Sequence, residues 1–220
     1  MTSPPIRTFG RTKSRTLKPA QAVLLTELLP RIAIPEGPYD PAGEGYAQAW
    51  LEIGFGGGEH LAGQAALRPD VLMLGAEPFL NGQASAVRHI QDKGLENVRL
   101  WPGDARELMA ALPDASLARI FILFPDPWPK VRHHKRRLVD AAFAAGAARV
   151  LIAGGRLRFA TDWASYADQA LEVLTHSPDF GWTAQRADDW RLAPADHVPT
   201  RYEAKALGDC APIWLEFQRV

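Results

Sequence analysis

Residues 121–137, FILFPDPWPKVRHHKRR, bring together four kinds of residue that can do chemistry. An apolar run ends at Phe124, Asp126 stands between two prolines, Trp128 follows, and a block of cations closes the segment. Proline fixes φ and lacks an N–H, so this stretch can neither continue a sheet nor begin a helix. The sequence therefore predicts a stiff turn that holds an acid and an aromatic ring in fixed positions.

The cations after this turn have no acid among them to neutralise their charge. Such a block is typical of a site that binds phosphate groups. The alternative is a proline-rich turn followed by the solvated start of a helix. We call residues 130–137 the basic patch, and its titratable members are Lys130, Arg132, His133, His134, Lys135, Arg136 and Arg137.

A glycine-rich turn follows the first predicted strand, in the sequence LEIGFGGGEHL. Gly54, Gly56 and Gly58 let the backbone turn tightly and approach a ligand before a helix begins near Glu59. A dinucleotide-binding turn needs glycine at its sixth position, which Glu59 occupies here. Glu52, two residues before the turn, would repel a pyrophosphate and attract the ammonium or sulfonium of S-adenosylmethionine. The turn is therefore predicted to bind that methyl donor.

Two more acids follow the next two predicted strands. Glu77 ends the second strand, where a carboxylate can accept hydrogen bonds from both ribose hydroxyls of a nucleoside. Asp104 follows the third strand, where it can accept from the exocyclic amine of adenine or, alternatively, cap a helix N-terminus. Acids after three successive strands together favour a nucleoside-binding edge.

Short apolar runs alternate with longer helical patterns from Trp50 onward, which favours an α/β fold. We expect a mostly parallel sheet with helices on both faces, including helices at residues 80–93, 138–150 and 166–174. Two last apolar segments, 182–185 and 213–217, are expected to pair as an antiparallel edge. The predicted parallel strands are residues 50–53, 71–76, 97–101, 119–124 and 156–160.

The chain has 220 residues, of which 47% are hydrophobic, so it is long enough for one large core. We expect a basic N-terminal arm and lead-in helix at residues 1–44 and a single domain at residues 45–220. The formal net charge is zero, yet the arm and the basic patch are both strongly cationic, which predicts a local anionic partner. The arm is expected to be mobile until a partner orders it, or else to be only a solvated tail. Its cations are Arg7, Arg11, Lys13, Arg15 and Lys18.

The single cysteine, Cys210, excludes an internal disulfide and a cysteine-cluster zinc site. The sequence also contains no signal-type run and no apolar stretch long enough to span a membrane. Together these features predict a reducing, cytoplasmic location without a membrane partner. No obligate protein partner is evident. No metal is expected, because His60, His89, His176 and His197 lack metal-ligand spacing and are predicted to be ordinary surface or core residues.

With these features together, the sequence resembles the bacterial tRNA (guanine-N7)-methyltransferases from about Gly45 to its C-terminus. The most specific motifs are FPDPWPKVRHHKRR, ATDW at residues 160–163 and TRYE at residues 200–203. The resemblance implies a Rossmann-like class I methyltransferase fold with S-adenosylmethionine as co-substrate. It also implies tRNA as the partner, and methyl transfer to N7 of a guanosine in its variable loop.

The resemblance further implies roles for individual residues. It places Asp126 in the catalytic centre as well as at the methyl donor. The other implied donor contacts are Glu52, Glu77 and Asp104, beside the glycines of the turn. Residues 132–137 are implied to meet the tRNA backbone. The remaining implied tRNA contacts are Lys130, Asp162, Thr200, Arg201, Tyr202 and Glu203.

Guanine N7 carries an in-plane lone pair and no proton, so in-line methyl transfer needs no general base. Asp126 and Asp162 are the candidates to stabilise the positive charge that develops on the purine, and an acid can also accept from guanine N1–H and the exocyclic amine. Alternatives stay open for three features. Asp162 can be a helix N-cap, Trp128 can pack under the turn or stack on a base, and residues 200–203 can form a surface loop or capping box.

Three other functions compete with this one. An amino-group methyltransferase uses an acid or asparagine followed by two prolines and an aromatic residue, and this chain has one proline too few after Asp126. A nucleotide oxidoreductase is disfavoured by Glu59 in the glycine turn. A noncatalytic RNA-binding module would keep the basic patch but would not need acids after three strands.

Overall fold

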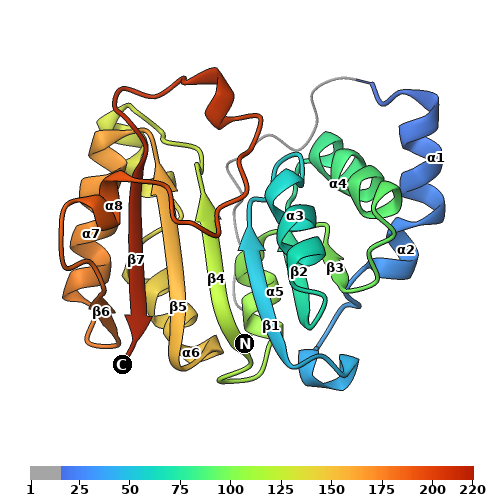
Figure 1. The fold of residues 1–220 in the computed structure, drawn as a ribbon, viewed down its shortest axis with the longest axis horizontal. Helices are drawn as coiled ribbons and strands as arrows, with labels where there is room; N and C mark the ends of the chain where they lie inside the picture. Colours follow the sequence, from blue (N-terminus) through green and yellow to red (C-terminus); the bar gives the residue numbers. More distant parts are fainter. Residues whose placement is uncertain (1–15) are drawn as a thin grey trace.

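The computed structural model describes residues 16–220, which form a seven-stranded sheet with helices on both faces (Figure 1). The strand order is β3-β2-β1-β4-β5-β7-β6, and the first five of these run parallel. β7 is antiparallel to both β5 and β6, so the predicted antiparallel edge is confirmed. The strands are β1 (Gln48–Ile53), β2 (Val71–Ala76), β3 (Val98–Trp101), β4 (Leu117–Leu123), β5 (Leu151–Thr161), β6 (Phe180–Trp182) and β7 (Ile213–Arg219).

The two faces of the sheet are covered differently. One face packs against α5 (Ala105–Ala111), α6 (Ala141–Val150) and α7 (Ala164–His176), and we call it the three-helix face. On the other face, α3 (Glu59–Leu67) and α4 (Leu80–Asp92) cover only the part of the sheet around β1, β2 and β3. The shorter elements are α1 (Pro19–Glu27), α2 (Leu29–Ile32), α8 (Asp188–Arg191), η1 (Pro41–Glu44), η2 (Val131–Arg136) and η3 (Glu203–Lys205).

A long connection between α8 and β7 crosses the rest of that second face (Figure 1). We call this connection, residues 192–212, the strap, and the face beneath it the strap face. Its side chains contact β4, β5 and α3, so it takes the place that a helix has elsewhere on the sheet. The sequence pattern did not predict that this segment would lie across the sheet.

Several predicted boundaries differ from the observed ones, and at α6 and β6 the reason is local. α6 begins at Ala141, not at residue 138, because the Asp140 carboxylate accepts from the Phe143 N–H and caps the helix. β6 ends at Trp182, ahead of the predicted segment 182–185. Thr183 directs both its N–H and its hydroxyl to the Glu216 carbonyl, and the chain then leaves the sheet.

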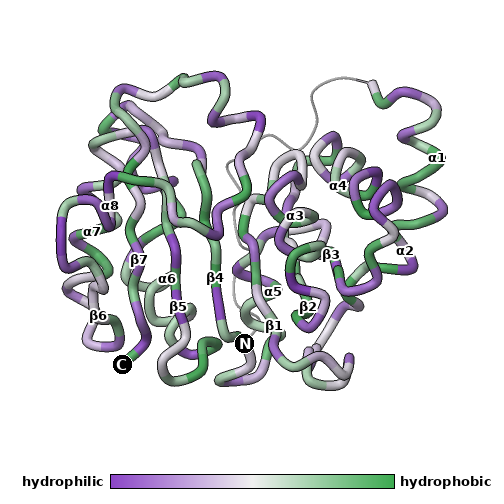
Figure 2. Tube along the Cα trace, in the orientation of Figure 1, coloured by the Kyte–Doolittle hydropathy of each residue, from purple (hydrophilic) through white to green (hydrophobic). Residues whose placement is uncertain are grey.

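Side chains alternate between the two faces along each strand. In β4, Ile120 and Ile122 belong to the core of the three-helix face, whereas Phe121 and Leu123 belong to the core of the strap face. The second half of this strand is buried and strongly hydrophobic (Figure 2). The pairing register sets a row across the strap face from four neighbouring strands: Glu52, Phe121, Arg158 and Glu216.

The strap is held on this face by a buried arginine. Arg158 is 3% exposed, and its guanidinium forms ion pairs with Glu216 and with Asp196 of the strap, at 2.7 Å each. Arg119 of β4 forms a second ion pair with Asp196, also at 2.7 Å, and its guanidinium lies 4.7 Å from the Phe121 ring. A buried arginine needs such partners, because an unpaired charge in this position would be strongly destabilising.

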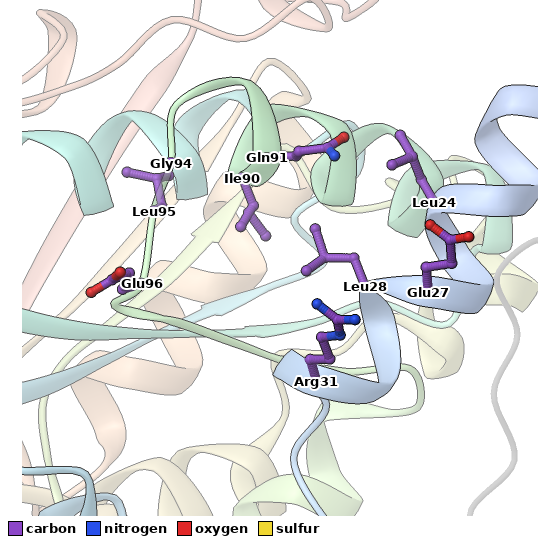
Figure 3. Close-up of a pocket in the computed structure, with 9 residues that line it drawn as sticks. All are labelled: Leu24, Glu27, Leu28, Arg31, Ile90, Gln91, Gly94, Leu95 and Glu96. Carbon is purple, nitrogen blue, oxygen red and sulfur yellow. The ribbon is translucent and has the colours of Figure 1, made fainter.

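The segment before β1 extends the domain at the β3 edge. Ala33 pairs with Leu100 as an isolated parallel bridge, and α1 lies beside α4 (Figure 1). A groove of about 340 Å³ remains between these helices (Figure 3). Among the predicted arm cations, Lys18 directly precedes α1, and the others lie outside the described residues. The division at residue 44 stays a prediction.

No helix within residues 16–220 combines the length and the apolar composition needed to cross a membrane.

Replacing Asp196 by asparagine tests how the strap is anchored. Burial by itself raises the pKa of Asp196, but hydrogen bonds to Arg158 and Arg119 and their charges outweigh it and lower the pKa to about 2. A lowered pKa in the folded state stabilises the fold above the unfolded-state pKa, and this contribution is lost as the pH falls toward about 2. We expect urea unfolding to give Asp196→Asn a lower free energy of unfolding than wild type. The difference should be constant near neutral pH and should shrink below about pH 4. A difference that stays unchanged in acid would contradict this anchoring.

Candidate active site

The candidate site lies at the carboxyl edge of the parallel strands. β1 leads into the glycine turn, in which Gly54, Gly56 and Gly58 have φ of 70°, 52° and 80°. These left-handed values favour glycine, and α3 begins directly after the turn, as predicted. A Cβ on Gly54 or Gly56 would meet no atom within 4 Å, so open space lies above this part of the turn. A Cβ on Gly58 would lie 2.5 Å from the Ala86 side chain, so close packing on α4 also requires glycine there.

Glu77 lies at the end of β2 and contacts the glycine turn. Its carboxylate accepts from the Gly56 N–H at 2.8 Å and from the Phe79 N–H at 2.9 Å, and the residue is 8% exposed. Burial raises the pKa of Glu77, and the charges of Asp126 and Glu52 raise it further, against the two backbone hydrogen bonds. Three acids from β1, β2 and the turn after β4 therefore act electrostatically on one another. A bound cation would relieve their repulsion.

Glu52 of β1 is buried at 3% exposure, and its Oε2 lies 2.7 Å from Nδ1 of His60 on α3. His60 was predicted to be an ordinary surface or core residue, and it is fully buried, but it also contacts a predicted donor-binding acid. A spacing of eight residues across the glycine turn joins the two. No general sequence pattern identifies such a pair, because the turn geometry alone brings the first turn of α3 back over β1.

Asp104 follows β3 and caps α5. Its carboxylate accepts from the Arg106 N–H at 2.9 Å and forms an ion pair with the Arg106 guanidinium at 2.7 Å. The N-cap interpretation that the sequence left open is therefore confirmed. A carboxylate can accept more than two hydrogen bonds, so the predicted contact with the adenine amine stays a prediction.

The turn after β4 contains two residues with unusual backbone conformations. Phe124 and Trp128, which flank Asp126, have φ of 52° and 45°, a left-handed region that bulky residues rarely adopt. Phe124 is anchored by its N–H, which donates to the Ala160 carbonyl at 2.8 Å. Asp126 itself is exposed. The predicted stiff turn is thus present, and it directs its acid toward solvent at the carboxyl edge.

Trp128 is half-buried and packs against the basic patch. The Arg136 guanidinium lies 4.8 Å from the centre of its ring, and the His133 ring meets it edge-on at 6.0 Å. The packing role that the sequence left open is therefore present, and base stacking stays a prediction.

The basic patch forms the short 3-10 helix η2, with exposed Lys130, Arg132 and Lys135. The pKa of His133 is lowered, first by desolvation and then by the charges of Arg136 and Arg132. This histidine therefore adds little positive charge at neutral pH. His134 is half-buried. The patch stays a predicted phosphate site through its lysines and arginines.

Arg137 is an exception, and its predicted role at the tRNA backbone is wrong. The residue is 4% exposed, and its guanidinium lies 4.8 Å from the Tyr166 ring. Its Nε–H donates to the Pro127 carbonyl at 2.9 Å, and its Nη atoms donate to Ser165 and Gln169 of α7. These contacts tie the proline turn to α7 and leave the guanidinium turned inward, away from any phosphate.

Asp162 lies directly after β5 and is 5% exposed. The N-cap alternative for this residue is wrong, because Trp163 occupies that position and Asp209 of the strap accepts from the Ala164 N–H at 2.8 Å. Within residues 16–220, Asp162 Oδ1 is buried without a hydrogen-bond partner. Burial raises the pKa of the Tyr202 hydroxyl, and the charge of Asp162 raises it further. An unpaired carboxylate oxygen of this kind calls for a donor from a ligand.

The TRYE motif, residues 200–203, joins the strap to the site. Glu203 accepts from the Thr200 N–H at 2.8 Å and its hydroxyl at 2.9 Å, as in a capping box. Arg201 donates to Glu59 of α3 and to Ser85 of α4. Tyr202 packs on Phe124, with the ring centres 5.6 Å apart. The motif therefore contacts the helix after the glycine turn, the middle of α4 and the proline turn together.

Comparison with known proteins identifies the family. A family model described as "Putative methyltransferase" matches residues 47–215. The chain is 56% identical over 218 residues to a tRNA (guanine-N(7)-)-methyltransferase of Caulobacter sp. (strain K31), with 98% of this chain and 96% of the relative covered. It is 52% identical over 220 residues to the enzyme of that name from Hyphomonas neptunium, with 97% and 99% covered. The chain belongs to the tRNA (guanine-N7)-methyltransferase family.

Solved structures agree on the fold. A 16S rRNA (adenine(1408)-N(1))-methyltransferase from Catenulisporales acidiphilia superposes with a TM-score of 0.54 at 15% identity, over 81% of this chain and 88% of that chain. TrmN from Thermus thermophilus gives 0.55 at 19% identity, over 91% of this chain and 48% of that chain. The predicted Rossmann-like class I methyltransferase fold is thus confirmed. Family membership makes the chain an enzyme and excludes the oxidoreductase and the noncatalytic module.

Changing Arg137 to lysine tests its structural role. The substitution keeps the positive charge but loses most of the forked hydrogen bonds to the turn and α7, each worth about 1 kcal/mol or more. We expect the unfolding free energy to fall by about 2 kcal/mol in urea titrations. Arg132→Lys, at an exposed position of the same patch, should change it by less than about 0.5 kcal/mol. Equal effects of the two variants would contradict the structural role of Arg137 and favour the surface role predicted from the sequence.

Proposed function

We propose that the protein transfers a methyl group from S-adenosylmethionine to N7 of a guanosine in tRNA, in the cytoplasm and at the variable loop. The observation that carries this proposal is the group of acids at one edge of the sheet, beside an open glycine turn and a cationic helix. Glu52, Glu77 and Asp126 form a site for a cationic nucleoside, and the basic patch forms a site for an anionic polymer.

The side chains around the glycine turn fit S-adenosylmethionine. Open space above Gly54 and Gly56 allows close approach to the backbone. Glu77 at the end of β2 has free acceptor capacity for ribose hydroxyls, since each of its oxygens accepts one backbone N–H. Glu52 supplies negative charge for the ammonium or sulfonium, and Asp104 an acceptor for the adenine amine. Within residues 16–220, no three side chains of metal-ligand type converge.

S-adenosylmethionine supplies an electrophilic methyl group on a sulfonium. The protein then has to hold guanine N7 in line with that group and to stabilise charge on the purine. Asp126 on the strained turn and Asp162 after β5 supply the carboxylates, and no residue has to remove a proton from N7. The buried, unpaired Oδ1 of Asp162 supports a role in accepting from guanine N1–H or its amine.

The tRNA backbone lies along the exposed part of the basic patch in this proposal, at Lys130, Arg132 and Lys135, with the half-buried Arg136 beside them. His133 and His134 lie beside these cations, and Arg137 supports them from inside. Residues 200–203 approach the substrate from the strap, and the arm cations add further positive charge. Phosphate contacts position the tRNA, whereas the acids at the sheet edge select guanine.

Methyl transfer tests the proposal directly. The protein is incubated with bulk tRNA and a donor carrying a labelled methyl group, the tRNA is digested, and the methylated nucleoside is identified by mass. We expect 7-methylguanosine. Asp126→Ala should lower the turnover number roughly 100-fold, because it removes charge stabilisation from the transition state without touching the core. Asp92→Ala, at the far end of α4, should leave turnover unchanged. Near-normal turnover in Asp126→Ala would refute its catalytic role.

The double variant Arg132→Ala with Lys135→Ala tests the basic patch. Each phosphate contact releases about one counterion, so losing two contacts should flatten the salt dependence of tRNA affinity by about 1.5 to 2 in slope. tRNA binding should weaken similarly for different tRNA sequences, while donor affinity stays unchanged. The control is Arg88→Ala with Lys93→Ala, which removes two exposed cations from α4. If the double variant keeps full tRNA affinity and an unaltered salt slope, η2 does not contact phosphate and is only a solvated helix.

A further inference from the structure

A buried histidine connects the candidate donor site to the strap. His60 is fully buried on α3, with Nδ1 at 2.7 Å from Glu52 Oε2. Its ring packs against Phe121 at 4.9 Å on one side and stacks on His197 of the strap at 5.5 Å. His60 therefore contacts Glu52 through Nδ1, and its ring lies between the sheet and the strap.

The neighbouring glutamine determines which nitrogen of His60 carries the proton. Gln64 Nε2 lies 2.6 Å from the Asp196 carbonyl oxygen, which can only accept, so the atom facing it is the NH₂ group. The same NH₂ group lies 3.3 Å from His60 Nε2. His60 Nε2 must then accept, which leaves the ring proton on Nδ1, where it donates to Glu52. The hydrogen-bond pattern assigns His60 as neutral, with the proton on Nδ1.

This assignment has a consequence for charge. An imidazolium beside Glu52 would neutralise the carboxylate, whereas a neutral imidazole orients it and leaves its negative charge in place. Within residues 16–220, neither an arginine nor a lysine forms an ion pair with Glu52. With a neutral His60, no ion pair within these residues neutralises the Glu52 carboxylate, and its negative charge can act on a cation at the glycine turn.

We propose that His60 is a positioning residue for methyl-donor binding. It holds the Glu52 carboxylate through a neutral Nδ1–H donor and so preserves the charge that binds the cationic end of S-adenosylmethionine. This inference rests on the proposed function for the identity of the ligand, but the tautomer and its cause are properties of the free protein.

The strap maintains this arrangement. Asp196 presents its carbonyl to Gln64 while its carboxylate is fixed by Arg119 and Arg158. The next residue, His197, covers the His60 ring and lies 2.8 Å from Glu203 of the TRYE motif. The strap thus fixes the Gln64 amide through its backbone and encloses His60 through a side chain.

Nuclear magnetic resonance of the ring nitrogens tests the tautomer in the free protein. Long-range proton–nitrogen spectra distinguish neutral Nδ1–H, neutral Nε2–H and imidazolium forms, and the His60 signals are assigned by their loss in His60→Asn. We expect the neutral Nδ1–H pattern, as the hydrogen bonds to Glu52 and Gln64 require. An imidazolium or an Nε2–H tautomer would overturn the proposal, whether or not the protein methylates tRNA.

A pair of variants of matched shape tests the effect on the donor. In His60→Asn the side-chain amide nitrogen replaces Nδ1 and can still donate to Glu52, whereas His60→Leu has nearly the same shape without a donor. By calorimetry, we expect His60→Asn to bind S-adenosylmethionine within about threefold of wild type and His60→Leu to bind it about tenfold or more weakly. tRNA affinity should be unchanged in both.

The two variants leave cavities of similar size, so a purely structural role would weaken both equally. Equal donor affinity of His60→Asn and His60→Leu would therefore refute the proposal. If His60→Leu does not fold, the resonance measurement and the affinity of His60→Asn still decide. Absence of donor binding to the wild-type protein would instead contradict the proposed function.

Discussion

Parallel pairing of β1, β2, β3 and β4 brings all their carboxyl ends to one edge, and every part of the candidate site depends on that placement. The same geometry gathers acids that repel one another, which is visible in the raised pKa of Glu77. The backbone N–H groups of Gly56 and Phe79 offset part of this repulsion. The edge is therefore predisposed toward a cation, and a neutral or anionic ligand would leave the repulsion in place.

Arginines in this protein have two separate tasks. Arg158 and Arg137 are buried and hold other segments in position, the first through ion pairs to the strap and the second through the Pro127 carbonyl and α7. Arg132 is exposed at the surface of η2. Arginine is suited to the buried task because its planar group offers several donors in fixed directions, so one side chain can connect three segments.

The strap contacts both the proposed methyl-donor site and the turn that carries Asp126. On one side it fixes the amide of Gln64, which holds His60 on Glu52 beside the glycine turn. On the other side it carries Tyr202, which packs on Phe124 at the start of the proline turn. A segment with little secondary structure thus contacts both the proposed donor site and the proline turn, and its ion pairs with the sheet hold it in place.

The sequence by itself determined which segments form the parallel strands, the glycine turn, the proline turn and the placement of Glu52, Glu77 and Asp126 near strand ends, because these follow from local pattern and from the rules of parallel sheets. Charge patterning also identified the basic patch but could not separate Arg137 from its neighbours, since its burial depends on α7, which follows later in the chain. The pairing of His60 with Glu52 and the path of the strap were likewise decided only in the tertiary structure. Both depend on contacts between segments far apart in sequence, such as Gln64 with Asp196, and no local propensity encodes those distances.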